Sequence, residues 1–412
     1  MKCIIDGDVA LARPLEGPLS AHIGAFAQWG REQGYALASR HRQVLLAAAF
    51  SRWLGQRGVR PRHVAAEHQA AYLRYRASRV RVRGEDATAL RQFVEFLRHE
   101  RVVRAEQRAC RRPTPAERAA HTFETYLRTE RGLADTTIAY YVPFVRGFLT
   151  DRFGTGRVRL SRIGAHDVVR FVQRQAPHLH LKRAKLLTTA LRCYLHFARY
   201  RGSVALDLAA AVPAVANWSM ASIPRAIPAD AITRVLTAID RRTPVGRRDY
   251  AILLLLARLG LRSSEVAFLE LDAIDWETGQ VSVRGKGGPR TALPLPSDVG
   301  AAIAAYLQHG RPATTSRRVF LRARAPVRGF LGPSAIGSVV GHAIARAGVT
   351  APSHGAHQFR HALATEMLRH GASLTEIGEV LRHRSPETTK IYTKVDLATL
   401  RTLALPWPGG GR

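Results

Sequence analysis

The sequence predicts a mainly α-helical protein with one small antiparallel β-sheet, in which helical N-terminal domains precede a larger α+β domain. Three features of the 412-residue chain support this prediction. Apolar residues recur at three- and four-residue spacing through most of the chain, which indicates amphipathic helices. Strand-like alternation is confined to residues 274–283. Hydrophobic residues make up 46% and charged residues 23%, a composition typical of globular proteins.

Residues 19 to about 105 form the first predicted helical stretch. Ile23 and Phe26 begin one apolar face, and Val44 and Ala48 belong to a second. Glycines and a proline interrupt the pattern between these faces and after them, so we expect several short helices joined by turns rather than one long helix.

Residues 117 to about 205 repeat the plan of the first stretch. A duplicated helical unit would produce this similarity, and so would two unrelated amphipathic bundles, so the sequence leaves both open. The matching segments are Glu32–Ala36 with Glu130–Ala134, Phe50 with Phe148, and, with one more residue of offset, Val64–Leu73 with Ile163–Val172.

Two proline-containing segments separate the helical stretches. Residues 105–116 are polar and rich in Arg, and residues 213–228 contain three prolines with little periodicity. Segments of this kind are typical of exposed interdomain connections. We therefore predict three domains, at 1–110, 117–212 and 225–412, of which the first is a candidate duplicate of the second.

The third domain carries the strongest pattern. An apolar helix is followed by the alternating segments and then by further helices, so the small sheet lies within a helical domain. The predicted helices span 230–239, 248–259, 297–308, 334–346, 357–370 and 374–381; the strands span 274–276 and 280–283, with turns at 277–279 and 285–288.

The charge balance points to a polyanionic partner. There are 63 Lys and Arg against 31 Asp and Glu, which gives a net charge of +32. Such a chain repels itself, and nucleic acid is the leading candidate for a partner, with a membrane surface second. Lys is rare and Arg common, so each Lys is informative, because Lys can release a proton and Arg effectively cannot. Lys occurs only at positions 2, 182, 185, 286, 390 and 394.

The cysteines and the hydropathy pattern bear on the compartment. Cys3, Cys110 and Cys193 are scattered and odd in number, which predicts neither a disulfide framework nor a paired-cysteine metal site. The longest apolar run, 251–257, is too short to span a bilayer, and the N-terminus has no signal-peptide core. We expect a cytoplasmic, nucleoid-associated protein with no membrane partner.

Arg262 lies in the first motif, Gly260-Leu261-Arg262-Ser263-Ser264-Glu265-Val266. A buried helix is expected to end at Gly260 and the next to begin at Arg262. A guanidinium at a helix N-terminus favours an anion, and Glu265, one turn later, is placed to orient it. An ordinary surface Arg–Glu pair would have the same spacing.

The second motif is His357-Gln358-Phe359-Arg360-His361. His357 and Arg360 share a helix face, which would combine an anion-binding group with one that titrates near neutral pH. A metal site at His354, His357 and His361 is the alternative. We predict no metal, because neither Cys nor carboxylate completes the set and Arg360 would repel a cation.

The third motif runs from Leu381 to Thr393 and contains His383 and Tyr392. A single Tyr is usually a core or interface residue. The unusual feature is its position shortly after a segment that contains His, Thr and Lys.

Taken together, these motifs resemble the tyrosine recombinase, or phage integrase, family. The resemblance covers about residues 225–400, and residues 117–205 resemble the helical core-binding domain of that family. All six catalytic positions of the family occur in order, and one departure is Arg382, where the family usually has Gly. The six are Arg262, Lys286, His357, Arg360, His383 and Tyr392.

The chemistry of DNA cleavage explains why these residue types are needed. Attack on a phosphodiester builds negative charge, which Arg262 and Arg360 would stabilise without a metal. Tyr392 would attack, and because its phenol has a pKa near 10, His357 is the predicted aid to its deprotonation. His383 would hydrogen-bond the phosphate. Lys286, the sole Lys between 185 and 390, would protonate the leaving 5′-oxygen.

The resemblance implies a 3′-phosphotyrosyl intermediate, formed without ATP or metal, so no cofactor is expected. It also implies double-stranded DNA as the partner and a homotetramer that acts on two duplexes; partner recombinases remain open. In the tail, Leu397, Leu400 and Leu403 form an apolar stripe that would pack either on a neighbouring protomer or in cis.

Three alternative functions would each account for part of the sequence. A type IB topoisomerase shares the chemistry, but the two-part helical N-terminal region and the tail favour recombination. A non-catalytic DNA-binding protein would be expected to lack one of the six residues. General solubility or nonspecific RNA contact would explain the charge and leave the ordered motifs unexplained. Among the biological roles, integration or transposition of a mobile element is the expectation.

Overall fold

The computed structural model describes residues 3–5, 9–11, 13–81, 83–104, 112–215, 227–285, 290–351, 353, 355–383 and 385–395. The fold is mainly helical with a small antiparallel sheet, as predicted. The chain divides into two compact units, one formed by residues 107–221 and the other by residues 1–106 with 222–412. No helix in the described ranges is long and apolar enough to cross a membrane.

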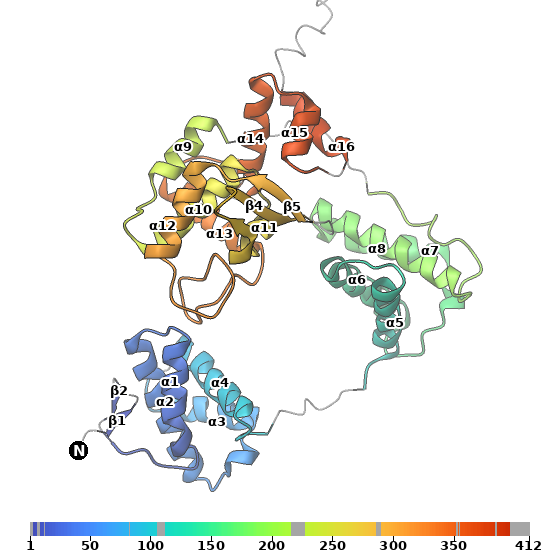
Figure 1. Cartoon of the computed structure of the whole chain (residues 1–412). Helices are drawn as coiled ribbons and strands as arrows, with labels where there is room; N and C mark the ends of the chain where they lie inside the picture. The colour runs from blue at the N-terminus through green and yellow to red at the C-terminus, as the bar shows by residue number, and fades with distance from the viewer. Residues whose placement is uncertain are drawn as a thin grey trace, which may run out of the picture. The chain divides into compact units, whose positions relative to one another are not determined.

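The N-terminal helices enclose a core in which Phe26, Phe50 and Phe93 are fully buried. A short antiparallel hairpin precedes these helices and was not predicted. Its strands are β1 (Cys3–Ile5) and β2 (Val9–Leu11), and the helices are α1 (Ile23–Glu32), α2 (Leu37–Gly55), α3 (Ala66–Ala77) and α4 (Gly84–His99), with a 3-10 turn, η2 (Pro61–His63), before α3 (Figure 1).

A second four-helix body follows. Its first helix begins inside the predicted linker 105–116, because Thr114 caps it: the Thr114 hydroxyl accepts from the Glu117 N–H at 3.2 Å, and the Glu117 carboxylate accepts from the Thr114 N–H at 2.7 Å. The helices are α5 (Pro115–Thr129), α6 (Asp135–Phe153), α7 (Ala165–Gln175) and α8 (Leu181–Tyr200), with a 3-10 turn, η3 (Leu160–Arg162), before α7.

The two four-helix bodies share internal geometry. A glycine in the left-handed region precedes the second helix of each, Gly34 with φ +77° and Gly132 with φ +56°. An aromatic pair joins the second and third helices, Phe50–Tyr72 with ring centroids 5.1 Å apart and Phe148–Phe171 with 5.3 Å.

A further aromatic cluster joins the first helix of each body to its last helix. In the first body Phe26 stacks on Trp29 with an interplanar angle of 12°, and its ring centroid lies 5.6 Å from that of Phe96. In the second body Phe123 stacks on Tyr126 at 22°, and the corresponding distance to Phe197 is 5.5 Å.

The C-terminal domain forms around α10, whose residues 251–256 are all buried. Helix α10 begins four residues earlier than predicted because Thr243 caps it: its hydroxyl accepts from the Gly246 N–H at 3.0 Å, and Pro244 occupies the first helical position. The helices are α9 (Ala229–Thr237), α10 (Pro244–Arg258), α11 (Ser263–Ala267), α12 (Ser297–His309), α13 (Ser334–Arg346), α14 (His357–Arg369), α15 (Leu374–Val380) and α16 (Pro386–Thr389).

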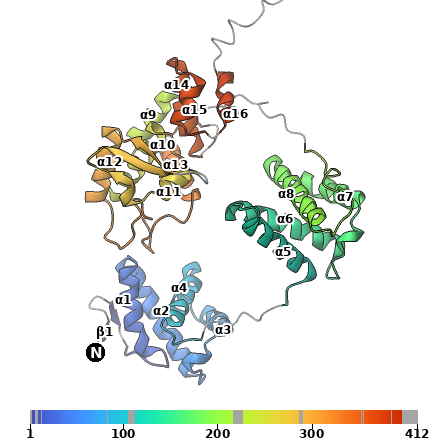
Figure 2. The same ribbon diagram turned by 45° about the vertical axis from the view of Figure 1, so that its right-hand side comes forward.

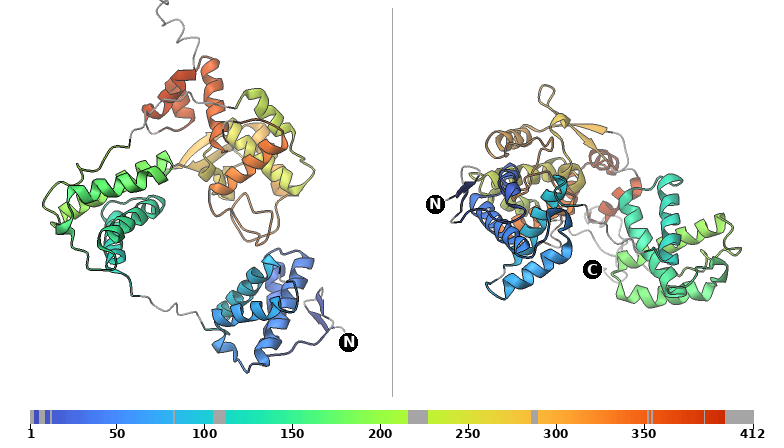
Figure 3. Two further views of the ribbon diagram at one scale, coloured as in Figure 1. Left: turned by 180° about the vertical axis from the view of Figure 1, so that it is seen from behind. Right: turned by 90° about the horizontal axis from the view of Figure 1, so that it is seen from below.

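The sheet of this domain has the order β3-β4-β5, with both pairs antiparallel. Its strands are β3 (Ile274–Asp275), β4 (Gln280–Arg284) and β5 (Arg290–Pro294). Within the domain, α14, α15 and α16 gather at one end, while the connection between α12 and α13 loops out at the opposite end (Figures 1, 2 and 3). The predicted turn at Lys286 and the apolar stripe of the tail lie outside the described residues.

Candidate active site

Arg262 occupies the N-cap position of α11, as the motif predicted. Its backbone N–H and its Nη1 each donate to the Glu265 carboxylate at 2.8 Å. The Glu265 side chain is only 1% exposed, whereas that of Arg262 is 27% exposed. An ordinary surface pair would leave both groups in solvent, so Glu265 is a buried carboxylate that orients Arg262.

Arg360 lies in the first turns of α14 and is 3% exposed. Its Nη1 donates to the Gly260 carbonyl at 2.5 Å, and its Nη2 donates to the Leu381 carbonyl. These bonds join the end of α10 to the end of α15. Burial, followed by the nearby charges of Arg262 and Arg382, lowers the pKa of Arg360 to about 10. Arg360 therefore stays protonated at neutral pH, in a cation-rich environment that an anion would stabilise.

His383 follows α15 and is held at both ends. Its backbone N–H donates to the Gly378 carbonyl at 2.8 Å, and its Nδ1 lies 2.8 Å from the Thr389 hydroxyl. Burial and the neighbouring cations, Arg360 first among them, lower the pKa of His383 to about 4. The imidazole is therefore neutral at pH 7, and it can donate a hydrogen bond to a phosphate oxygen without adding a full charge.

Tyr392 lies in the 3-10 helix η6 (Lys390–Val395) and is 2% exposed. Its ring packs in an apolar cluster with Ala364, Ile377 and Leu381. Burial raises the pKa of the phenol to about 12, although the charge of Arg360 acts in the opposite direction. A phenol with this pKa is protonated at neutral pH, so attack through its oxygen requires a proton acceptor.

The group that meets the Tyr392 hydroxyl is His361, whose Nδ1 lies 2.9 Å away. His357 was the predicted aid to deprotonation, and His361 was not predicted in this place. The rings of His357 and His361 are 5.7 Å apart. Burial, His357 and Arg360 lower the pKa of His361, so it is neutral and able to accept a proton. The signal was present in the sequence, because two His one helical turn apart share a face.

The fold thus gathers Arg262, Arg360, His383 and Tyr392 around the ends of α10, α14 and α15. The charges of Arg262 and Arg360 both act on His383, and the charge of Arg360 acts on Tyr392. Lys286 lies outside the described residues, and so does His354 of the alternative metal site. Over the part of the chain that the structure describes, no group of three His, Cys, Asp or Glu is suited to a metal.

Comparison with known proteins gives three concordant results. Residues 225–398 match the phage integrase family. The protein y4rA of Sinorhizobium fredii, named an integrase/recombinase, is 54% identical over 99% of both chains. Tyrosine recombinase XerD of Mycobacterium tuberculosis is 33% identical over 69% of this chain and 94% of its own length. This chain belongs to the phage integrase family of tyrosine recombinases.

Tyrosine recombinases also share its fold. The XerH site-specific recombinase, in a post-cleavage complex with a palindromic difH substrate, superimposes with a TM-score of 0.55 over 82% of this chain and 94% of its own, at 19% identity. At this identity the likeness concerns the fold. Family membership identifies the chain as a site-specific recombinase and as an enzyme that acts on DNA.

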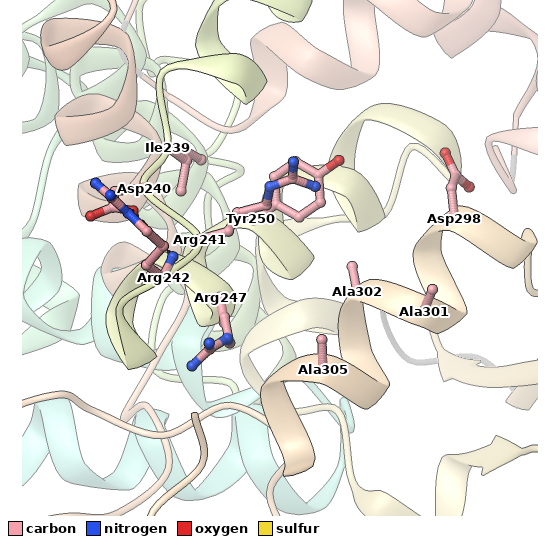
Figure 4. A pocket seen from close by; sticks show the side chains of 10 residues that line it. All are labelled: Ile239, Asp240, Arg241, Arg242, Arg247, Tyr250, Asp298, Ala301, Ala302 and Ala305. Carbon is pink, nitrogen blue, oxygen red and sulfur yellow. Dashed lines mark hydrogen bonds and ion pairs between the residues drawn. The ribbon is translucent and has the colours of Figure 1, made fainter. Parts of the chain in front are cut away.

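A separate surface pocket of the recombinase domain lies between α12 and the turn before α10. Figure 4 shows Asp298 and three alanines of α12 on one side, with Arg241, Arg242 and Arg247 on the other. The Arg241 guanidinium lies 4.8 Å from the centre of the Tyr250 ring, and Arg242 pairs with Asp240 at 2.9 Å. None of the five predicted catalytic residues that the structure describes lines this pocket, so we do not place the active site there.

Proposed function

We propose that this recombinase cleaves one DNA strand by attack of the Tyr392 hydroxyl oxygen on the scissile phosphorus. The bond between phosphorus and the 5′-oxygen breaks, and a 3′-phosphotyrosyl link forms in its place. The phenol proton passes to an imidazole, and the 5′-oxygen leaves as a hydroxyl after protonation. A 5′-hydroxyl from another strand then reverses the step, so neither ATP nor a metal ion takes part.

The observation that carries the proposal is the grouping of two cations and two neutral imidazoles beside Tyr392. Arg262 and Arg360 use some of their N–H groups on Glu265 and on backbone carbonyls. Each guanidinium has five N–H groups, so both keep donors for the non-bridging oxygens of a phosphate. His383 supplies a further hydrogen bond, and Lys286 is proposed as the acid for the leaving oxygen.

For the proton of Tyr392 we propose His361 as the direct acceptor, with His357 as its neighbour. Support comes from the 2.9 Å separation between His361 Nδ1 and the phenol oxygen. The ring of His357 lies 5.7 Å from that of His361, so His357 is the neighbour of the proposed acceptor. Because the phenol pKa is about 12 and that of His361 is lowered, the transfer is uphill in the free protein, so we propose that it accompanies formation of the oxygen–phosphorus bond.

We also propose a three-domain organisation, 1–110, 117–212 and 225–412, in which the first domain is a duplicate of the second. Support comes from the matched aromatic pairs, the matched left-handed glycines and the 3-10 turn before the third helix of each. Independent bundles have no reason to share all three features. Residues 19–104 hold 16 Arg against 6 acidic residues, so both copies are proposed to bind double-stranded DNA.

At the level of assembly we propose a homotetramer that joins two duplexes, with strand exchange in a mobile DNA element as the biological role. The support is the near full-length similarity to a relative named an integrase/recombinase. Integration and transposition both fit this proposal, which also includes association with the nucleoid.

The test is covalent trapping on nicked suicide substrates made from DNA that flanks the gene, without added metal. Wild-type protein should give an adduct, and Tyr392→Phe should give none. Tyr306→Phe is the matched control, because Tyr306 is also 2% exposed and lies in the same domain. An adduct that survives in Tyr392→Phe would refute the assignment of the nucleophile.

A further inference from the structure

Arg382 has a backbone conformation that favours glycine. Its φ is +55°, and the only other non-glycine residue with positive φ in the described ranges is Arg101, with φ +59°. The left-handed region brings Cβ close to the backbone and destabilises residues other than glycine. The family usually has Gly here, so this chain retains a strained residue where an unstrained one is available. We expect the interactions of the Arg382 side chain to offset this strain.

The Arg382 side chain is 11% exposed, and its Nη2 donates to Glu265 Oε2 at 2.9 Å. Glu265 therefore pairs with two guanidinium groups, because Arg262 donates to its other oxygen. Arg262 Nη2 also donates to the backbone carbonyl of Arg382 at 3.0 Å. Hydrogen bonds therefore join Arg262, Glu265 and Arg382 to one another. The strained residue thus links the α11 motif to the segment that carries His383.

The charges of this group have a direct consequence. Arg262 and Glu265 alone sum to zero, and the buried carboxylate would oppose a phosphate. With Arg382 the three groups sum to one positive charge. Two further donors of Arg382, Nε and Nη1, are buried and have no hydrogen-bond partner among the described residues. Arg382 also lines one surface pocket together with His383, so it lies beside a group proposed to contact the phosphate.

We propose that Arg382 is a positioning residue for DNA strand cleavage, which neutralises Glu265 and fixes the Arg262 guanidinium for the scissile phosphate. The inference rests on the proposed function, since it assigns Arg382 a part in the same cleavage step. Without Arg382, Glu265 would accept more hydrogen bonds from the Arg262 guanidinium. Fewer donors and less positive charge would then face the phosphate. Lys at this position would restore charge without the planar fork, so it should act as a partial substitute.

The test compares single-turnover cleavage of a suicide substrate, at saturating protein, with thermal unfolding of the same full-length variants. Arg382→Gly should slow cleavage about 10- to 100-fold, the range that loss of a hydrogen bond to a charged group produces. Its melting temperature should change little, because glycine relieves the left-handed strain while the lost bond to Glu265 costs stability. Arg382→Lys should recover part of the rate. Arg101→Gly is the matched control for backbone strain: the same change at φ +59° should also leave the melting temperature level or raise it.

A second arm asks whether Arg382 acts through Glu265. In a Glu265→Gln background the carboxylate charge is gone, so adding Arg382→Gly should slow cleavage much less than it does in wild type. Equal fold losses in both backgrounds would overturn the proposal, and so would cleavage by Arg382→Gly within twofold of wild type. Loss of rate in strict parallel with melting temperature would also overturn it. Failure of the wild-type protein to cleave would count instead against the proposed function.

Discussion

Gly260→Ala tests the connection between the fold and the Arg360 site. Gly260 has φ +55°, lies just after α10 and is the first residue of the Arg262 motif. A Cβ at this position would lie 2.7 Å from Leu381 Cδ2 and 3.0 Å from Leu363 Cδ2. The left-handed conformation costs alanine about 1 kcal/mol, and overpacking of this kind adds about 1–3 kcal/mol. We therefore expect a loss of about 2–4 kcal/mol in the free energy of unfolding.

The matched control is Gly279→Ala in the same domain. Gly279 has φ +61°, and a Cβ there would meet no atom of the described residues within 4 Å, so only the conformational cost of about 1 kcal/mol applies. Denaturant unfolding, with hydrogen exchange of α14 peptides as the domain-specific readout, gives both values. Gly260→Ala should also slow cleavage, because the Gly260 carbonyl accepts a hydrogen bond from Arg360. Equal destabilisation by the two variants would refute the packing argument.

Three further predictions follow from the site and the domains. His361→Gln should keep a polar neighbour for Tyr392 but remove the proton acceptor, slowing single-turnover cleavage about 100-fold; a rate equal to wild type would exclude His361 from the transfer. Because the pKa of His383 is about 4 in the folded protein and 6.5 ordinarily, the unfolded chain binds the proton more tightly. The neutral His383 side chain therefore makes its full contribution to stability above pH 6.5, and this contribution is lost as the pH falls toward 4. The urea concentration at the unfolding midpoint should thus drop between pH 7 and pH 5. The drop should be smaller in His383→Gln, and an unchanged pH dependence would contradict the assignment. Deletion of residues 1–110 should weaken DNA binding and reduce its salt dependence while cleavage of a pre-nicked site continues; loss of that cleavage would argue against a separate grip on DNA.

Helix periodicity predicted the C-terminal domain closely. Helices α12 to α15 begin where the amphipathic spacing placed them, and at α15 the Ser373 side chain also caps the helix. The β1–β2 hairpin was missed, although Asp6-Gly7 between two apolar trios is a recognised hairpin signal. The start of α5 was placed inside a linker because an Arg- and Pro-rich composition outweighed the capping box at Thr114.

The sequence predicted which residues are candidates for the site, but not which of them contact one another. The spacing of the motifs, together with the resemblance to the family, brought out Arg262, Arg360, His383 and Tyr392 as candidates. It did not distinguish His357 from His361, because both lie on one face of α14 and only the packing of η6 decides which imidazole meets Tyr392. Arg382 stood out only as a departure from the Gly that is usual in the family. Its bond to Glu265 joins residues far apart in the chain, and local sequence carries no signal for such a pair.

The most direct test of the central claim is the chemical identity of the bond in the trapped adduct. Adduct formed on a suicide substrate would be digested with protease and nuclease, and the peptide that carries the nucleotide would be sequenced by mass spectrometry. The account predicts a peptide modified at Tyr392 and joined to the 3′-phosphate of the cleaved strand. A nucleotide joined through a 5′-phosphate, or carried on any other residue, would contradict it.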